Sequence, residues 1–187
     1  MTLRPLFFLL LALATPLSSL ASQDSAGLLI TDFSLDTETI PLQATFGVKI
    51  RNMTPIRTTM DDGAQLQISC KATLSEIRPL KWAREMAESS LAINFRKNTL
   101  IQDVVISNGQ DEIMPEEDFE AHMGRLLERL YLTLDPAEPL ESGKNYRFAL
   151  EVTLKRRDLP SWMQVPFLFK SWDIVPGDRA EREFQAP

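Results

Sequence analysis

Three segments of the chain alternate apolar and polar residues with a period of two. They span residues 42–51, 65–74 and 145–154. This period places alternate side chains on opposite faces of a β-strand, so one face is buried and the other meets water. Strands of this kind need a shared apolar interior, which favours antiparallel sheets. The apolar positions are Leu42, Ala44, Phe46, Val48 and Ile50; Leu66, Ile68, Cys70, Ala72 and Leu74; and Tyr146, Phe148, Leu150, Val152 and Leu154.

The sequence predicts one long helix, over residues 115–130. Glu116, Glu117 and Asp118 fill its first turn, where the helix dipole favours negative charge. The apolar residues recur at helical spacing and form one stripe that would pack on a sheet face or cap one end of a sandwich; they are Phe119, Met123, Leu126, Leu127 and Leu130. A shorter helix is expected between the first two alternating strands. It would begin at Thr54-Pro55, with Thr54 as N-cap, and end at Gly63.

Shorter strands complete the pattern. Strand character is present over residues 28–35, 91–96, 100–106 and 132–134, with a turn at residues 97–99. Asn108-Gly109 signals a tight hairpin turn. Residues 81–89 fit either a helical turn or an extended edge. The sum predicts a β-rich α+β fold, an antiparallel two-sheet sandwich with one main helix, in a single domain over residues 22–175. Residues 176–187 are mostly polar and charged and are expected to form a flexible C-terminal tail.

The N-terminus has the composition of a secretory signal peptide. Arg4 precedes an unbroken apolar run over residues 6–14, and small residues at Ser19 and Ala21 fit cleavage after Ala21. The apolar run is shorter than the roughly 20 residues that a lasting membrane helix needs. We therefore expect residues 1–21 to be removed, the protein to be periplasmic, and no membrane span to remain.

Charge argues against nucleic acid as a partner. Removing Arg4 with the signal segment turns 20 Lys and Arg into 19, against 26 Asp and Glu, so the net charge is −7. The longest basic cluster is Lys155-Arg156-Arg157. A chain with this net negative charge is expected to bind poorly to nucleic acid or to an anionic membrane surface. The single cysteine, Cys70, excludes an internal disulfide, so stability must come from an apolar core.

The order of these parts resembles a bacterial exported family, the domain of unknown function 4390. The resemblance rests on the helix end and glycine turn over residues 60–66, on residues 146–154, on Leu159-Pro160 and on Ser171-Trp172-Asp173. It implies this fold and an exported location, and it implies no established activity. Members are said to be encoded near two-component signalling genes, which implies an accessory role in the cell envelope.

The residues do not form a recognisable catalytic or metal-binding motif. His122 is the only histidine, and we expect it at the boundary of the helix stripe. Cys70 lies in the apolar register of a strand and is interpreted as a small buried hydrophobe rather than a nucleophile. The acidic clusters Asp61-Asp62, Asp111-Glu112 and Glu116–Asp118 do not have calcium-loop spacing, although a structural cation there remains an alternative. We expect no enzyme, no cofactor and no metal.

One aromatic cluster is a candidate interaction surface. Its members, which flank Pro166, are Trp162, Phe167, Phe169 and Trp172. They would either close the core of the sandwich or remain exposed as a docking surface for a protein or lipid partner. The preferred hypothesis is a non-enzymatic interaction or accessory module with an envelope protein partner. The alternative is a small-molecule or lipid-binding β-domain, which a large apolar cavity would favour. A hydrolase would require polar residues that converge from distant segments.

Overall fold

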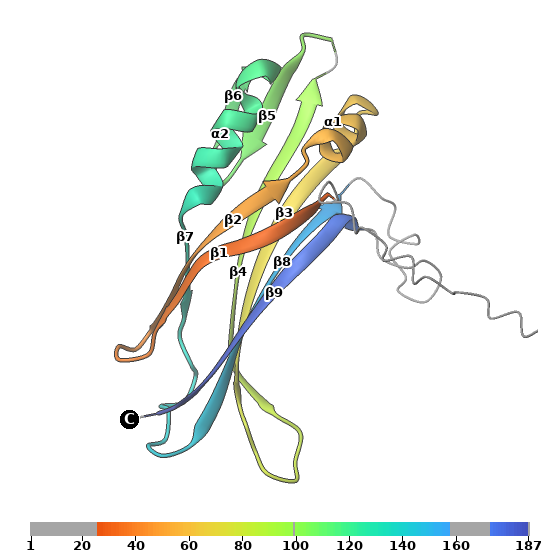
Figure 1. Cartoon of the computed structure of the whole chain (residues 1–187). Helices are drawn as coiled ribbons and strands as arrows, with labels where there is room; N and C mark the ends of the chain where they lie inside the picture. The colour runs from red at the N-terminus through yellow and green to blue at the C-terminus, as the bar shows by residue number, and fades with distance from the viewer. Residues whose placement is uncertain (1–25, 99, 158–172, 187) are drawn as a thin grey trace, which may run out of the picture.

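A computed structural model describes residues 26–98, 100–157 and 173–186 (Figure 1). The described elements follow one another as β1 (Gly27–Asp36), β2 (Leu42–Arg51), α1 (Thr54–Asp61), β3 (Gln65–Glu76), β4 (Arg84–Asn98), β5 (Asp103–Ser107), β6 (Asp111–Pro115), α2 (Glu116–Glu128), β7 (Leu130–Leu134), β8 (Asn145–Arg156) and β9 (Asp173–Gln185). The strands form two antiparallel sheets. The small sheet has the order β1-β2-β7, and the large sheet has the order β6-β5-β4-β3-β8-β9.

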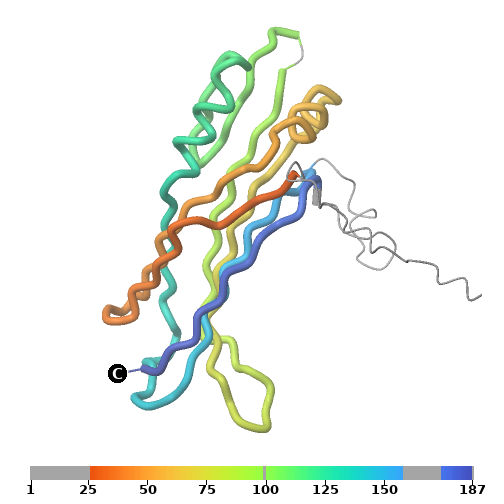
Figure 2. Tube along the Cα trace, viewed as in Figure 1, coloured from red at the N-terminus to blue at the C-terminus, as the bar shows by residue number. Residues whose placement is uncertain are grey.

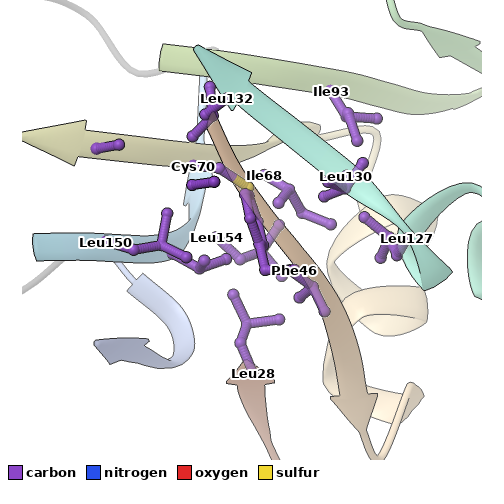
Figure 3. Packing of buried hydrophobic residues seen from close by; sticks show 14 of the residues in the cluster. Leu28, Phe46, Ile68, Cys70, Ile93, Leu127, Leu130, Leu132, Leu150 and Leu154 are labelled. Carbon is purple, nitrogen blue, oxygen red and sulfur yellow. The ribbon is translucent and has the colours of Figure 1, made fainter. Parts of the chain in front are cut away.

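The two sheets share one apolar core, as the alternation predicts. Alternate residues of β2, β3 and β8 are buried, including all fifteen apolar positions of the three segments except Ile50, which is partly buried. Figure 3 shows Phe46 and Leu132 of the small sheet in the same cluster as Ile68 and Leu154 of the large sheet. The predicted β-rich α+β sandwich is therefore confirmed.

Strand β3 lies at the centre of the large sheet. It pairs along its whole length with β4, from Gln65 to Glu76, and along its other edge with β8, from Leu66 to Glu76. Strand β4 begins at Arg84, so most of the ambiguous segment 81–89 is extended. Strand β1 of the small sheet runs beside β9, which is one of the two outer strands of the large sheet (Figure 1).

Helix α2 covers the end of the core through the predicted stripe. Phe119, Met123 and Leu127 are buried, and the helix packs chiefly on β2. This close packing needs a glycine at position 47, because a Cβ there would lie 2.6 Å from Thr31 Oγ1 and 2.7 Å from the Glu128 carbonyl oxygen. The helix confirmed here is slightly shorter than the predicted one, since β7 already begins at Leu130.

The N-cap residue of helix α1 lies one position earlier than the sequence predicts. Met53 is the N-cap residue instead of Thr54, and the backbone N–H of Thr54 donates to Asn52 Oδ1 at 3.0 Å. Gly63 has φ +81°, as expected for the left-handed residue after the helix. The hairpin at Asn108 and Gly109 is also confirmed, but its turn has three residues and only Gly109, at φ +87°, is left-handed among them.

The prediction of a flexible tail over residues 176–187 is wrong for residues 176–185. These residues belong to β9, which pairs with β8 from Asp173 to Gln185. The strand is bulged near Gly177, where a Cβ would lie only 2.4 Å from the Val152 carbonyl oxygen. Its outer face is charged, so it shows no apolar alternation, and cross-strand ion pairs such as Arg147 with Glu183 at 2.7 Å take the place of that signal.

Candidate functional site

The β3–β4 hairpin ends in an exposed apolar tip, residues 77–83, which we call the hairpin tip. Its turn projects beyond the neighbouring ends of β8 and β9 (Figure 2). Leu80 is fully exposed and Trp82 is 93% exposed, so the two side chains make almost no contact with the described residues. Exposed apolar side chains that gather in one place are candidates for a contact surface. The β4–β5 turn carries a similar pair, Leu100 and Ile101, so the hairpin tip is distinguished by the cations around it.

The hairpin tip has a defined backbone conformation. The Nη2 of Arg78 donates to the carbonyl oxygen of Trp82 at 2.9 Å, across the turn. The backbone N–H of Ile77 donates to the carbonyl oxygen of Asn145 at 2.8 Å, which ties the tip to β8. Leu80 has φ +62°, a strained value for a residue with a branched side chain. The turn therefore holds Leu80 away from the protein at a cost in backbone energy.

A cationic pocket of about 220 Å³ lies between the hairpin tip and the outer face of the large sheet. Thr73, Ser75 and Ala149 form its sheet side, because their neighbours in β3 and β8 point into the core. Its cations are Arg78, Lys81, Arg147 and Arg179.

Two of these four cations are neutralised within the protein. Arg147 pairs with Glu183 at 2.7 Å, and Arg179 pairs with Glu181 at 2.5 Å. Arg78 and Lys81 form no ion pair with another described residue. The Nε of Arg78 is buried and has no hydrogen-bond partner among the described residues. An unmatched buried donor beside an unpaired lysine is an arrangement suited to an anionic oxygen.

A second hollow, the α2 groove, lies between helix α2 and the β1–β2 edge of the small sheet. It has a volume of about 530 Å³, and Val48, Met123 and Leu127 are among its apolar lining residues. Asp32, Glu120 and Glu128 contribute carboxylates to its rim, and Lys49 contributes an ammonium group; these are part of the same lining. Asp32 has φ +50° at a bulge in β1. The groove could hold an apolar group next to a polar or cationic one.

The aromatic surface predicted from sequence lies outside the described residues. This holds for each of its members, which are Trp162, Phe167, Phe169 and Trp172. The hairpin tip was not anticipated, although a signal existed. Leu80 and Trp82 fall outside every alternating segment, and Arg78, Lys81 and Arg84 are interleaved with them.

Cys70 has the environment predicted for a buried hydrophobe. Its side chain is fully buried in β3, and this burial raises the pKa of the thiol from 9.0 to about 12. A thiol with such a pKa carries negligible thiolate at neutral pH and is a poor nucleophile.

His122 and one member of each of the three acidic clusters have partners within the protein. The Nε2 of His122 lies 3.1 Å from Glu112 Oε2 at the partly exposed edge of α2. Asp61 and Glu116, from two separate predicted clusters, converge on Lys97 at 2.5 Å and 2.6 Å from its Nζ. The Lys97 ammonium therefore balances a carboxylate in each of two clusters at which a structural cation was an alternative. Within residues 26–98, 100–157 and 173–186, His, Cys, Asp and Glu form no group of three placed to hold a metal ion.

Neither of the two described helices is long and apolar enough to span a bilayer.

The family described as "domain of unknown function (DUF4390)" matches residues 25–182, which cover both sheets and both helices. No curated protein and no solved structure matches the chain. Because this match covers most of the sequence, the chain belongs to the DUF4390 family.

Proposed function

We propose that this protein is an exported, non-enzymatic docking module of the bacterial cell envelope, and that the hairpin tip is its contact surface. The observation that carries the proposal is the exposure of Leu80 and Trp82 on a turn that Arg78 braces. Water contact with two large apolar side chains is unfavourable by roughly 1.5–3 kcal/mol for each, relative to burial. A partner that covers them gains this energy on binding.

The N-terminal sequence supports the periplasmic location. Arg4, the apolar run over residues 6–14 and the small residues before Ser22 have the order of a cleavable export signal. Fractionation of native cells followed by N-terminal sequencing tests this part. A periplasmic form that begins at Ser22 supports it, and a cytoplasmic form that retains Met1 contradicts it.

Site-specific photocrosslinking in living cells tests the contact surface. A photoreactive amino acid replaces Trp82 in one variant and Leu100, which is 92% exposed on the β4–β5 turn, in the control. We expect an adduct with an envelope component at position 82, no such adduct at position 100, and loss of the adduct in Leu80→Ser. Equal adducts at both positions, or none at position 82, contradict the proposed role of the tip.

The α2 groove supports a second candidate function, the binding of a small amphipathic molecule. Its volume of about 530 Å³ falls in the range of ligand sites. Gly124 borders the groove, and a Cβ built there meets no atom within 4 Å, so Gly124→Phe can fill the space without a clash at its first carbon. Native mass spectrometry should find a bound molecule in the wild type and in Gly124→Ala, and not in Gly124→Phe. A ligand-free wild type contradicts this function.

A further inference from the structure

We propose that the partner of the hairpin tip is an anionic phospholipid surface: Leu80 and Trp82 enter the interface, and Arg78 and Lys81 bind lipid phosphate. This inference rests on the proposed function, because it names the partner of the same surface. It differs from the expectation drawn from total charge, which disfavours an anionic membrane. The net charge counts every charged residue of the chain, whereas the structure places several cations together at the hairpin tip.

The apolar part of the argument comes from residue type and position. Trp82 carries a large ring with one polar N–H, which is the combination that concentrates at the boundary between lipid tails and water. Leu80 is fully exposed two residues earlier, at the part of the turn held away from the sheet. A turn offers a narrow apolar point, which can enter a lipid interface more readily than it can cover a broad protein surface.

The charged part of the argument comes from the groups around these two side chains. Arg78 and Lys81 have no ion-pair partner among the described residues, while Arg84 is paired with Glu138. Glu76 directly precedes the tip and is the nearest acidic residue in sequence; its carboxylate pairs with Lys144 at 3.0 Å, and the nearby charges of Arg78 and Arg84 also help to lower its pKa. The two unpaired cations lie on the pocket side of the turn, where the Arg78 Nε lacks an acceptor. A phosphate group in the pocket would balance both charges.

The negative charge of the rest of the chain does not prevent this contact. At physiological ionic strength, charges separated by more than about 8 Å are largely screened. The described acidic residues near the pocket, Glu76, Glu181 and Glu183, are themselves paired with Lys144, Arg179 and Arg147. The charge that meets the lipid is therefore set by the unpaired cations of the hairpin tip.

A fluorescent label on the tip tests this inference directly. Leu80→Cys provides one reactive thiol, because Cys70 is buried and stays unlabelled in the folded protein. Leu100→Cys is the matched control on a different turn. Each variant, isolated as the native cell makes it, carries an NBD label. Each is then mixed with vesicles of phosphatidylcholine alone or of phosphatidylcholine with roughly 30% phosphatidylglycerol.

We expect a blue shift of the NBD emission at position 80 with the anionic vesicles and none at position 100. Because the label reports its own surroundings, membrane binding by another part of the chain does not imitate this result. Lys81→Gln should weaken the vesicle affinity about fivefold, the effect of one cation at an anionic surface. Lys155→Gln, the same change on an exposed residue of β8, should leave the affinity unchanged.

The remaining outcomes separate the two proposals. No shift at position 80, or equal shifts at positions 80 and 100, overturns the lipid inference. If the shift is absent while the crosslink at position 82 captures an envelope protein, the docking function stands and its partner is that protein. If both experiments fail at the tip, the proposed function fails together with this inference. A shift that is equally strong with phosphatidylcholine alone overturns the role of Arg78 and Lys81.

Discussion

The carboxylate of Asp178 accepts a hydrogen bond of 2.7 Å from the backbone N–H of Ile30. Asp178 belongs to β9 of the large sheet, and Ile30 belongs to β1 of the small sheet. The bond therefore joins the two sheets along the edge where β1 runs beside β9. The outer edge of β1 has no neighbouring strand in its own sheet to accept hydrogen bonds from its backbone N–H groups. The Asp178 side chain accepts one of these bonds instead.

Removing this acceptor should destabilise the fold. Asp178→Ala leaves the N–H of Ile30 without its partly buried partner, and we expect the free energy of unfolding to fall by about 1–3 kcal/mol. Asp178→Asn keeps an oxygen acceptor and should lose less. Urea unfolding measures both variants, with an unchanged slope as the sign that stability alone has changed. Equal midpoints for wild type and Asp178→Ala would contradict the role of this bond.

Two glycine-to-alanine variants should change stability in opposite directions. Gly47→Ala places a methyl group 2.6 Å from Thr31 Oγ1 and 2.7 Å from the Glu128 carbonyl oxygen, so α2 must move from β2. We expect a loss of about 1–3 kcal/mol. Gly124→Ala meets no atom within 4 Å, and alanine favours the helix by roughly 1 kcal/mol. Thermal unfolding should show a lower midpoint for the first variant and a higher one for the second.

The buried thiol should make stability depend on alkaline pH. Between pH 9 and about 12 the unfolded chain releases the Cys70 proton, while the folded chain retains it because burial raises its pKa to about 12. The unfolded state then binds fewer protons, so stability falls with rising pH by about 1.4 kcal/mol per unit from this group. The stability advantage of wild type over Cys70→Ala should therefore narrow above pH 9. A constant difference would contradict the burial.

Reaction of the thiol provides a separate check. Cys70 should remain unmodified by a thiol reagent such as DTNB at neutral pH in the folded protein and should react once urea unfolds it. The rate of modification should then follow the population of unfolded chain. Rapid modification without urea would show that the thiol is accessible.

Lys97 should connect the two helices to β4 through its ion pairs. Its Nζ lies 2.5 Å from Asp61 of α1 and 2.6 Å from Glu116 of α2, and its side chain is only 8% exposed. Lys97→Met leaves two carboxylates near each other, and we expect a loss of about 1–2 kcal/mol, moderated by the water that reaches both carboxylates. Asp61→Asn in the same chain should restore part of it. Lys155→Met, at an exposed position, should cost little.

The contribution of Lys97 should also disappear at high pH. Its hydrogen bonds to Asp61 and to Glu116 raise the pKa of the ammonium above 10.5. A raised pKa means that the stabilisation is complete below pH 10.5 and is lost as pH rises through the folded value. The difference between wild type and Lys97→Met should stay level at neutral pH and shrink in strong alkali. A difference that grows with pH would contradict this assignment.

The sequence predicted those parts of the fold that depend on apolar periodicity. Strands β2, β3 and β8 each bury one face, so their residues alternate and the fold class follows from them. Strand β9 was missed because its outward residues, including Arg179, Glu181 and Glu183, are charged and its inward ones are few. Its place in the sheet depends on backbone pairing with β8, which leaves no periodic signal in one sequence.

The candidate site depended on exposure, which a sequence pattern does not report. Leucine and tryptophan are residue types that usually lie in a core. The three-dimensional turn is what shows that Leu80 and Trp82 face water. The cationic pocket brings Lys81 of the turn close to Arg147 of β8, which is far away in sequence. The burial of Cys70, in contrast, followed from its register in an alternating strand and was predicted correctly.

The position of β3 has a consequence for how the molecule assembles. One of its neighbours, β4, is adjacent in the chain, but the other, β8, begins only at Asn145. A polypeptide that appears N-terminus first can close the β3–β4 hairpin early, and it must then keep the opposite flank of β3 unpaired until most of the chain has emerged. That open flank can recruit a strand from another molecule. A binding chaperone during this interval would therefore raise the yield of correctly folded protein.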